Sequence, residues 1–164
     1  MSHSSVLALA NETGAEFLQA LRAPEFLVPT VLLPGIFYSM FGILLSKGGT
    51  AGYLLATYGV FAVTGPALFG FGVGVASERE KGWLELKRVM PASGLHYITA
   101  KLLTTLIFAT FALLPIYALA GFVGDVAMTR MQWLTLASVH LLAVAPFSLV
   151  GLMLGFSFGS GGAV

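Results

Sequence analysis

Apolar residues gather in four long stretches along the chain, separated by shorter polar segments. The stretches cover residues 26–46, 53–76, 102–124 and 133–156. Each is close in length to the roughly 20 helical residues that cross the hydrocarbon core of a bilayer. None of them contains an acidic residue, a lysine or an arginine. We therefore predict an all-α fold, a polytopic transmembrane helix bundle with four spans.

The composition of the chain favours a lipid environment. Hydrophobic residues make up 57% of the 164 residues and charged residues only 9%, whereas about 25% of residues are charged in a typical soluble domain. Four such helices cannot all be buried by one another in so short a chain, so lipid is the expected solvent. The net charge of +1 provides no basic surface for nucleic acid. Cysteine is absent, which excludes disulfides and thiolate metal ligands.

Glycines crowd the second stretch, at positions 65, 70, 72 and 74. Small residues let membrane helices approach closely, and this is the simpler interpretation. Gly70 and Gly72 also have the spacing that begins a dinucleotide-binding fingerprint, but the strand and the later acidic residue of that motif are missing. Five prolines within or near the stretches predict kinked helices, because neighbouring helices satisfy the freed carbonyl groups in a membrane. They are Pro29, Pro34, Pro66, Pro115 and Pro146.

Basic residues between the stretches predict the orientation of the chain. Six lie before the first stretch or between the second and third: Arg22, Arg79, Lys81, Lys87, Arg88 and Lys101. Only Lys47 and Arg130 lie in the two other connections. Because basic loops stay in the cytoplasm, we expect the N-terminus and residues 77–101 on the cytoplasmic side.

Residues 1–25 form the first cytoplasmic element. The first ten residues lack the basic region and long apolar core of a signal peptide, so we expect a mobile tail there. Thr13 and Glu16 have the spacing of a capping box, which predicts that a short helix begins near Thr13 and stops before Pro24. Its apolar residues would share one face: Phe17, Leu18 and Leu21. Such a helix suits the membrane interface, although a plain juxtamembrane anchor explains the spacing equally well.

The segment 77–91 between the second and third stretches holds most of the chemistry. Seven of its fifteen residues are charged, out of fifteen charged residues in the whole chain. In one continuous helix, Glu78, Lys81, Glu85 and Arg88 would lie on a shared face with alternating signs. Trp83, Leu86 and Met90 would form an apolar stripe beside it. Pro91 would end this helix, and Ser93 would cap the next.

Two interpretations of this charged segment remain open. A solvated loop that only sets topology needs basic residues, but it needs neither an acidic set nor an apolar stripe. A mixed-charge helix with an apolar stripe is more typical of a docking surface for a soluble partner. We favour docking.

The same residues resemble a known family. Glu78, Arg79, Glu80, Gly82, Leu84, Glu85 and Pro91 match a motif of the permease subunits of ABC transporters of the second exporter type, the ABC type-2 transporter transmembrane family. Trp83 stands where that family more often has threonine. The order of parts is also similar: an amphipathic N-terminal helix, a first span with prolines, a glycine-rich second span, a charged cytoplasmic helix and two further spans.

The resemblance implies a function for residues 26–164 as a permease domain of a bacterial cytoplasmic membrane, with a coupling segment at 77–101. The coupling residues would be Glu78, Arg79, Glu80, Lys81, Trp83, Glu85, Lys87 and Arg88. They would dock on a separate cytosolic ABC ATPase subunit, and a second permease subunit would complete the translocation path. The chain has no phosphate-binding loop, so we expect no ATP hydrolysis, catalytic residue or cofactor in the chain itself.

The family usually has six spans, and the sequence shows four. The chain therefore resembles a permease that is cut off at Val164, in the turn at residues 159–164 that would lead into a fifth span. An alternative is a non-transporting membrane anchor or remnant. A membrane enzyme is a third interpretation.

His140 is an ionisable residue within a predicted span, the fourth. Such a residue suggests a proton relay or a contact to cargo. The alternative is a neutral imidazole bonded to the backbone or a hydroxyl of a neighbouring helix. No two histidines have metal-site spacing, so we expect no metal. Ser138 is two residues from His140, so the two side chains would point apart on a helix. The absence of carboxylates from the spans favours an amphipathic or apolar cargo.

Overall fold

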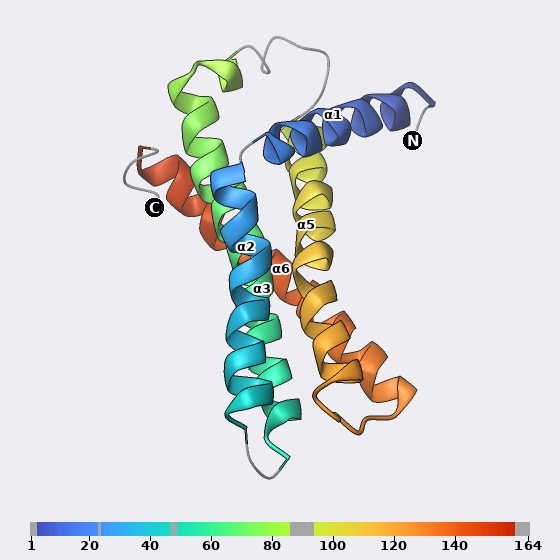
Figure 1. Cartoon of the computed structure of the whole chain (residues 1–164). Helices are drawn as coiled ribbons and strands as arrows, with labels where there is room; N and C mark the ends of the chain where they lie inside the picture. The colour runs from blue at the N-terminus through green and yellow to red at the C-terminus, as the bar shows by residue number, and fades with distance from the viewer. Residues whose placement is uncertain (1–2, 23, 47–48, 86–93, 160–164) are drawn as a thin grey trace.

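The computed structural model describes residues 3–22, 24–46, 49–85 and 94–159. Within these ranges the chain is helical and has no strand, as the prediction of an all-α fold required (Figure 1). The elements are α1 (His3–Leu21), α2 (Pro24–Phe37), the π-helix η1 (Tyr38–Leu44), α3 (Ala51–Glu80), α5 (Gly94–Phe122) and α6 (Arg130–Ser157). The five prolines that were expected within or near the membrane helices all lie inside helices.

Three of the helices described are long and apolar enough to cross a membrane: α3, α5 and α6. α3 and α6 contain the second and fourth stretches predicted from the sequence, and α5 covers the third except for its last two residues, 123 and 124. The first stretch forms α2 and η1, whose apolar part, Val28–Leu44, is shorter than the other three. It runs beside α3 for much of its length (Figure 1).

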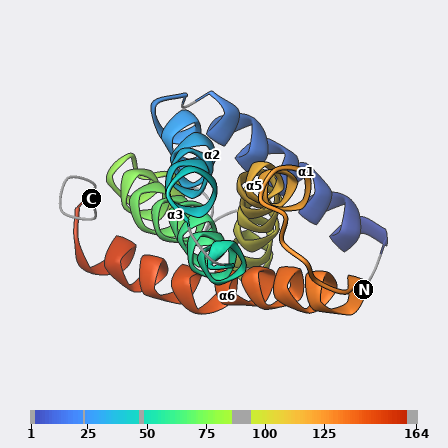
Figure 2. The ribbon, with the colours of Figure 1, turned by 60° about the horizontal axis from the view of Figure 1, so that its bottom comes forward.

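The helices pack around a layer formed by α3 and α5. Figure 2 shows α6 along one side of this layer and α1 with α2 on the other. Small side chains such as Ala62, Ala67 and Ala112 are fully buried between the helices. Because lipid tails are as apolar as the side chains, close packing rather than the hydrophobic effect holds such helices together.

Glycines bring α3 and α6 into backbone contact. A Cβ atom placed on Gly151 would lie 2.9 Å from the carbonyl oxygens of Ala67 and Leu68, and one on Gly155 would lie 2.6 Å from the carbonyl oxygen of Gly72. Gly72 thus has the packing role predicted for the glycines of the second stretch. Gly70 and Gly72 both lie inside α3 rather than at a strand-to-helix turn, so the dinucleotide-binding interpretation is wrong.

The N-terminal helix α1 crosses the end of the bundle at a steep angle to α5 (Figure 1). Two predictions about it were wrong. The helix begins at His3, so residues 3–10 are helical rather than a mobile tail, in keeping with the strong helix propensity of their leucines and alanines. Thr13 is therefore an interior residue, and its hydroxyl donates to the carbonyl of Leu9 (2.8 Å) instead of capping the helix.

Candidate functional site

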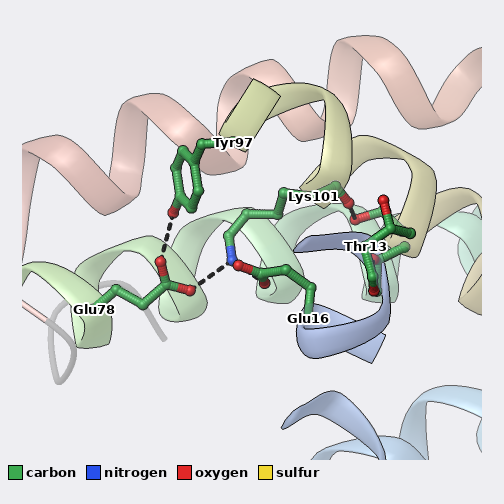
Figure 3. A network of polar contacts seen from close by, with 7 residues as sticks. Thr13, Glu16, Glu78, Tyr97 and Lys101 are labelled. Carbon is green, nitrogen blue, oxygen red and sulfur yellow. Dashed lines mark hydrogen bonds and ion pairs between the residues drawn. The ribbon is translucent and has the colours of Figure 1, made fainter. Parts of the chain in front are cut away.

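A buried polar cluster joins α1, α3 and α5 close to the end of α3 (Figure 3). The Lys101 ammonium on α5 donates to Glu16 Oε2 on α1 and to Glu78 Oε1 on α3, both at 2.7 Å. The Tyr97 hydroxyl donates to the other oxygen of Glu78 at 2.8 Å. Glu78 is 1% exposed and Lys101 is 4% exposed, so this is an interior network rather than a surface ion pair.

Helix periodicity on α5 places Tyr97 and Lys101 on one face. They are four residues apart, so their side chains are neighbours on the helix, and the Lys101 nitrogen lies 5.2 Å from the centre of the Tyr97 ring. The aromatic face favours the cation. Buried charges are tolerated when they are paired and hydrogen-bonded, and removal of one partner leaves the others uncompensated. The cluster therefore ties three helices together through one lysine.

The cluster corrects three predictions. Glu16 was expected in a capping box at the start of a helix, but it lies inside α1 and points into the bundle, where it binds Lys101. Lys101 was counted as a basic loop residue, but it lies inside α5. Glu78 was expected on an exposed docking face and is buried instead. A sequence pattern could not show this, because the partners of Glu78 on α5 lie 19 and 23 residues away.

The predicted continuous helix over 77–91 is interrupted. α3 ends at Glu80, and Gly82 has a φ of +71°, a left-handed conformation that glycine adopts without steric cost. A new helical turn begins at Trp83 and is described as far as Glu85. Because the helix breaks at Gly82, Glu78 and Lys81 do not share a helical face with Glu85.

The residues around the break, 80–85, form an exposed turn. Glu80, Lys81 and Glu85 are exposed, and Trp83 is 41% exposed. The Lys81 nitrogen lies 5.2 Å from the centre of the Trp83 ring. Lys87, Arg88, Met90, Pro91 and Ser93 lie outside the described residues, so the predictions about them stay predictions. The described turn thus presents an indole ring among acidic and basic groups.

Arg79 binds the end of α6. Its two terminal nitrogens donate to the backbone carbonyls of Phe156 and Phe158, the second at 2.7 Å. A cation at a helix C-terminus complements the helix dipole and the unpaired carbonyls there. Next to it, Glu80 Oε1 lies 2.7 Å from the position that a Cβ atom on Gly159 would take. No local pattern could have predicted this contact, since Phe156 lies 77 residues from Arg79.

His140 lies on α6, faces α3 and α5, and is 1% exposed. One ring nitrogen, Nε2, donates to the Ala56 carbonyl of α3 (3.0 Å), and Nδ1 accepts from the Tyr117 hydroxyl of α5 (2.8 Å) in the neutral tautomer. Gly59 of α3 leaves room for the ring, because a Cβ atom there would collide with it. This matches the alternative prediction, a histidine satisfied by backbone and hydroxyl partners.

The Ser138 hydroxyl is exposed and donates to the Leu134 carbonyl (2.8 Å), whereas His140 is buried, so the two do not form a catalytic pair. In the part of the chain that the structure describes, no group of three or more His, Cys, Asp or Glu side chains is placed to hold a metal ion.

Comparison with known proteins shows one similarity of note. The chain is 23% identical over 153 residues to a curated protein of Bacillus subtilis (strain 168) named "Putative transport permease YvfS". The match covers 90% of this chain and 62% of the length of that relative. No family model and no solved structure matches the chain. Together with the apolar helices, the similarity supports a multi-pass membrane protein of the transport permease kind.

Proposed function

We propose that the chain is a permease subunit of an ATP-driven ABC exporter in a bacterial cytoplasmic membrane. It would form part of the translocation path with a second permease subunit and would dock on a cytosolic ABC ATPase. The ATPase would supply the chemistry of hydrolysis, and this chain would supply the membrane path and the docking turn.

The exposed turn at residues 80–85 is the observation that carries this proposal. It follows directly after a helix long and apolar enough to cross a membrane. Trp83 in this turn is 41% exposed, and aromatic residues are enriched at the centres of protein interfaces. The acidic and basic groups around Trp83 would orient a partner electrostatically. Arg79 and Glu78, by contrast, bind within the chain and hold the turn in place.

A four-span topology with a cytoplasmic N-terminus completes the proposal. The apolar segment Val28–Leu44 lies beside α3 and would form the first span with the residues before it. α1, the start of α5 and the end of α3 lie at one end of the bundle (Figure 1). Arg22, Arg79 and Lys81 are at this end, which basic residues favour on the cytoplasmic side.

The test is co-purification with an ATP-hydrolysing subunit from the native membrane. Glu85→Lys combined with Trp83→Ala should reduce the recovered ATPase activity roughly tenfold or more, since interface anchors commonly contribute over 1–2 kcal/mol each. These two residues are exposed, so the fold should survive. Arg130→Glu, at the opposite end of α6 from the turn, is the matched control. Unchanged association of the double variant would remove the docking claim and favour a membrane anchor.

A further inference from the structure

Glu78 and Arg79 are adjacent in the chain, yet their side chains bind different helices. Glu78 is held by Lys101 and Tyr97 of α5, and Lys101 continues the network to Glu16 of α1. Arg79 donates to two carbonyl groups at the end of α6. Successive residues of an α-helix point about 100° apart, so two neighbouring positions can engage two sides of α3.

Both attachments lie directly before the break in the helix. The backbone N–H of Lys81 donates to the Ser77 carbonyl (3.1 Å) and that of Gly82 to the Arg79 carbonyl (3.0 Å), which closes the last turn of α3. The left-handed Gly82 then changes the direction of the chain within the exposed turn at 80–85, and a new helical turn begins at Trp83. The turn therefore extends from a helix end that is fixed on two sides.

We infer that Glu78 and Arg79 are positioning residues that attach the turn at 80–85 to two separate groups of helices. Glu78 attaches it to α5 and α1, and Arg79 attaches it to α6. A movement of the turn is then transmitted to α5 and α1 through Glu78, and separately to α6 through Arg79. This inference rests on the proposed function for the origin of the movement, whereas the two links are properties of this chain alone.

The two links differ in their surroundings. Glu78 is buried and receives two donors on two oxygens, so its link is directional and shielded from salt. Arg79 is partly exposed and binds backbone carbonyls, so its link has no second charge to neutralise. The Glu78 link should therefore be less sensitive to ionic strength than the Arg79 link.

Distances between paired spin labels test the independence of the links. The chain has no cysteine, so introduced cysteines are the only labelled sites. One pair joins Glu85→Cys to Leu18→Cys on α1, and another joins Glu85→Cys to Met153→Cys on α6. The sample is the purified full chain in lipid nanodiscs without any ATPase. Leu18 and Met153 are 55% and 70% exposed, so labels fit there.

Each variant should affect one distance only. Glu78→Gln should broaden the 85–18 distribution about twofold or more and leave the 85–153 distribution unchanged, because only the first link is weakened. Arg79→Gln should do the reverse. Arg130→Gln, which removes a cation at the far end of α6, should change neither distribution. Broadening of both distances by either variant, or of neither by both, overturns the inference.

A second variant keeps the test informative if Glu78→Gln does not fold. Tyr97→Phe removes one donor to Glu78 and keeps every charge, so it should broaden the same 85–18 distribution by a smaller factor. The experiment contains no ATPase, so its outcome is separate from the docking test. Independent links with no ATPase binding would overturn the proposed function alone, and ATPase binding with a single shared link would overturn this inference alone.

Discussion

At the scale of single residues, Lys101 is the most deeply buried of the described lysine and arginine side chains. It is almost fully buried, and it contacts two carboxylates at 2.7 Å and an aromatic ring. Buried charges are tolerated when they are paired and hydrogen-bonded. The partners of Lys101 come from three helices, so this pairing depends on how all three helices pack.

Replacing Lys101 by methionine should therefore destabilise the fold. The variant leaves Glu16 and Glu78 buried without their shared cation, and breaking a buried ion pair in this way costs about 3–5 kcal/mol. Unfolding of the detergent-solubilised protein, followed by circular dichroism, measures the loss. Lys81→Met is the control, because Lys81 is exposed and surface changes usually stay within about 0.5 kcal/mol. Equal losses for the two variants would contradict the role assigned to Lys101.

At the scale of elements, the contact between α3 and α6 depends on glycine. Gly151 and Gly155 are four residues apart, so they form a groove on one face of α6, and the backbone of α3 near Gly72 fills it. This close approach also brings the end of α6 within reach of Arg79. The helix break at Gly82 is a second local feature that depends on glycine, through its positive φ.

A side chain in the groove should separate the two helices. Gly155→Val places atoms against the Gly72 and Phe71 carbonyls, where even a single Cβ atom is too close. Overpacking of this kind costs about 1–3 kcal/mol, and the loss of the Arg79 contact should add to it. Ala145→Val, on the exposed side of the same helix, is the matched control. The midpoint of thermal unfolding measures both, and a midpoint for Gly155→Val equal to that of the control would refute the groove.

At the scale of the whole molecule, the arrangement of the helices relative to the membrane determines the function. α1 lies across the end of the bundle where α3 ends and α5 begins (Figure 1). With that end in the cytoplasm, the exposed turn would face a soluble partner, and the connection between α5 and α6 would face the opposite side. The proposed function therefore depends on which end of the helix bundle faces the cytoplasm.

Accessibility of single cysteines should reveal this orientation. On intact cells, a membrane-impermeant maleimide should label Asp125→Cys and Thr50→Cys, while Glu85→Cys and Leu18→Cys should react only after the membrane is permeabilised. All four positions are exposed in the structure, so burial does not confound the result. Labelling of Thr50 and Asp125 from the same outer side is what a four-span topology requires. Labelling of Glu85 on intact cells would contradict the predicted orientation.

The sequence by itself determined the class of the molecule. A run of about 20 apolar residues can satisfy its backbone only as a helix in lipid, so the stretches that became α3, α5 and α6 were visible from composition and length alone. The sequence also allowed two further predictions: that glycines such as Gly72 pack closely against another helix, and that the His140 ring nitrogens are hydrogen-bonded to a neighbouring helix.

Only the tertiary structure decided which charged residues point inward. The periodicity around Glu16 and Glu78 describes a helix face but does not say whether that face meets water, lipid or Lys101. The partners of these residues lie on other helices, and the same is true of Arg79 and the end of α6. Such contacts depend on how helices cross, which local spacing does not encode. The positive φ of Gly82 depends likewise on α3 ending there, so the exposed turn follows from the fold and could not be predicted from the charge pattern.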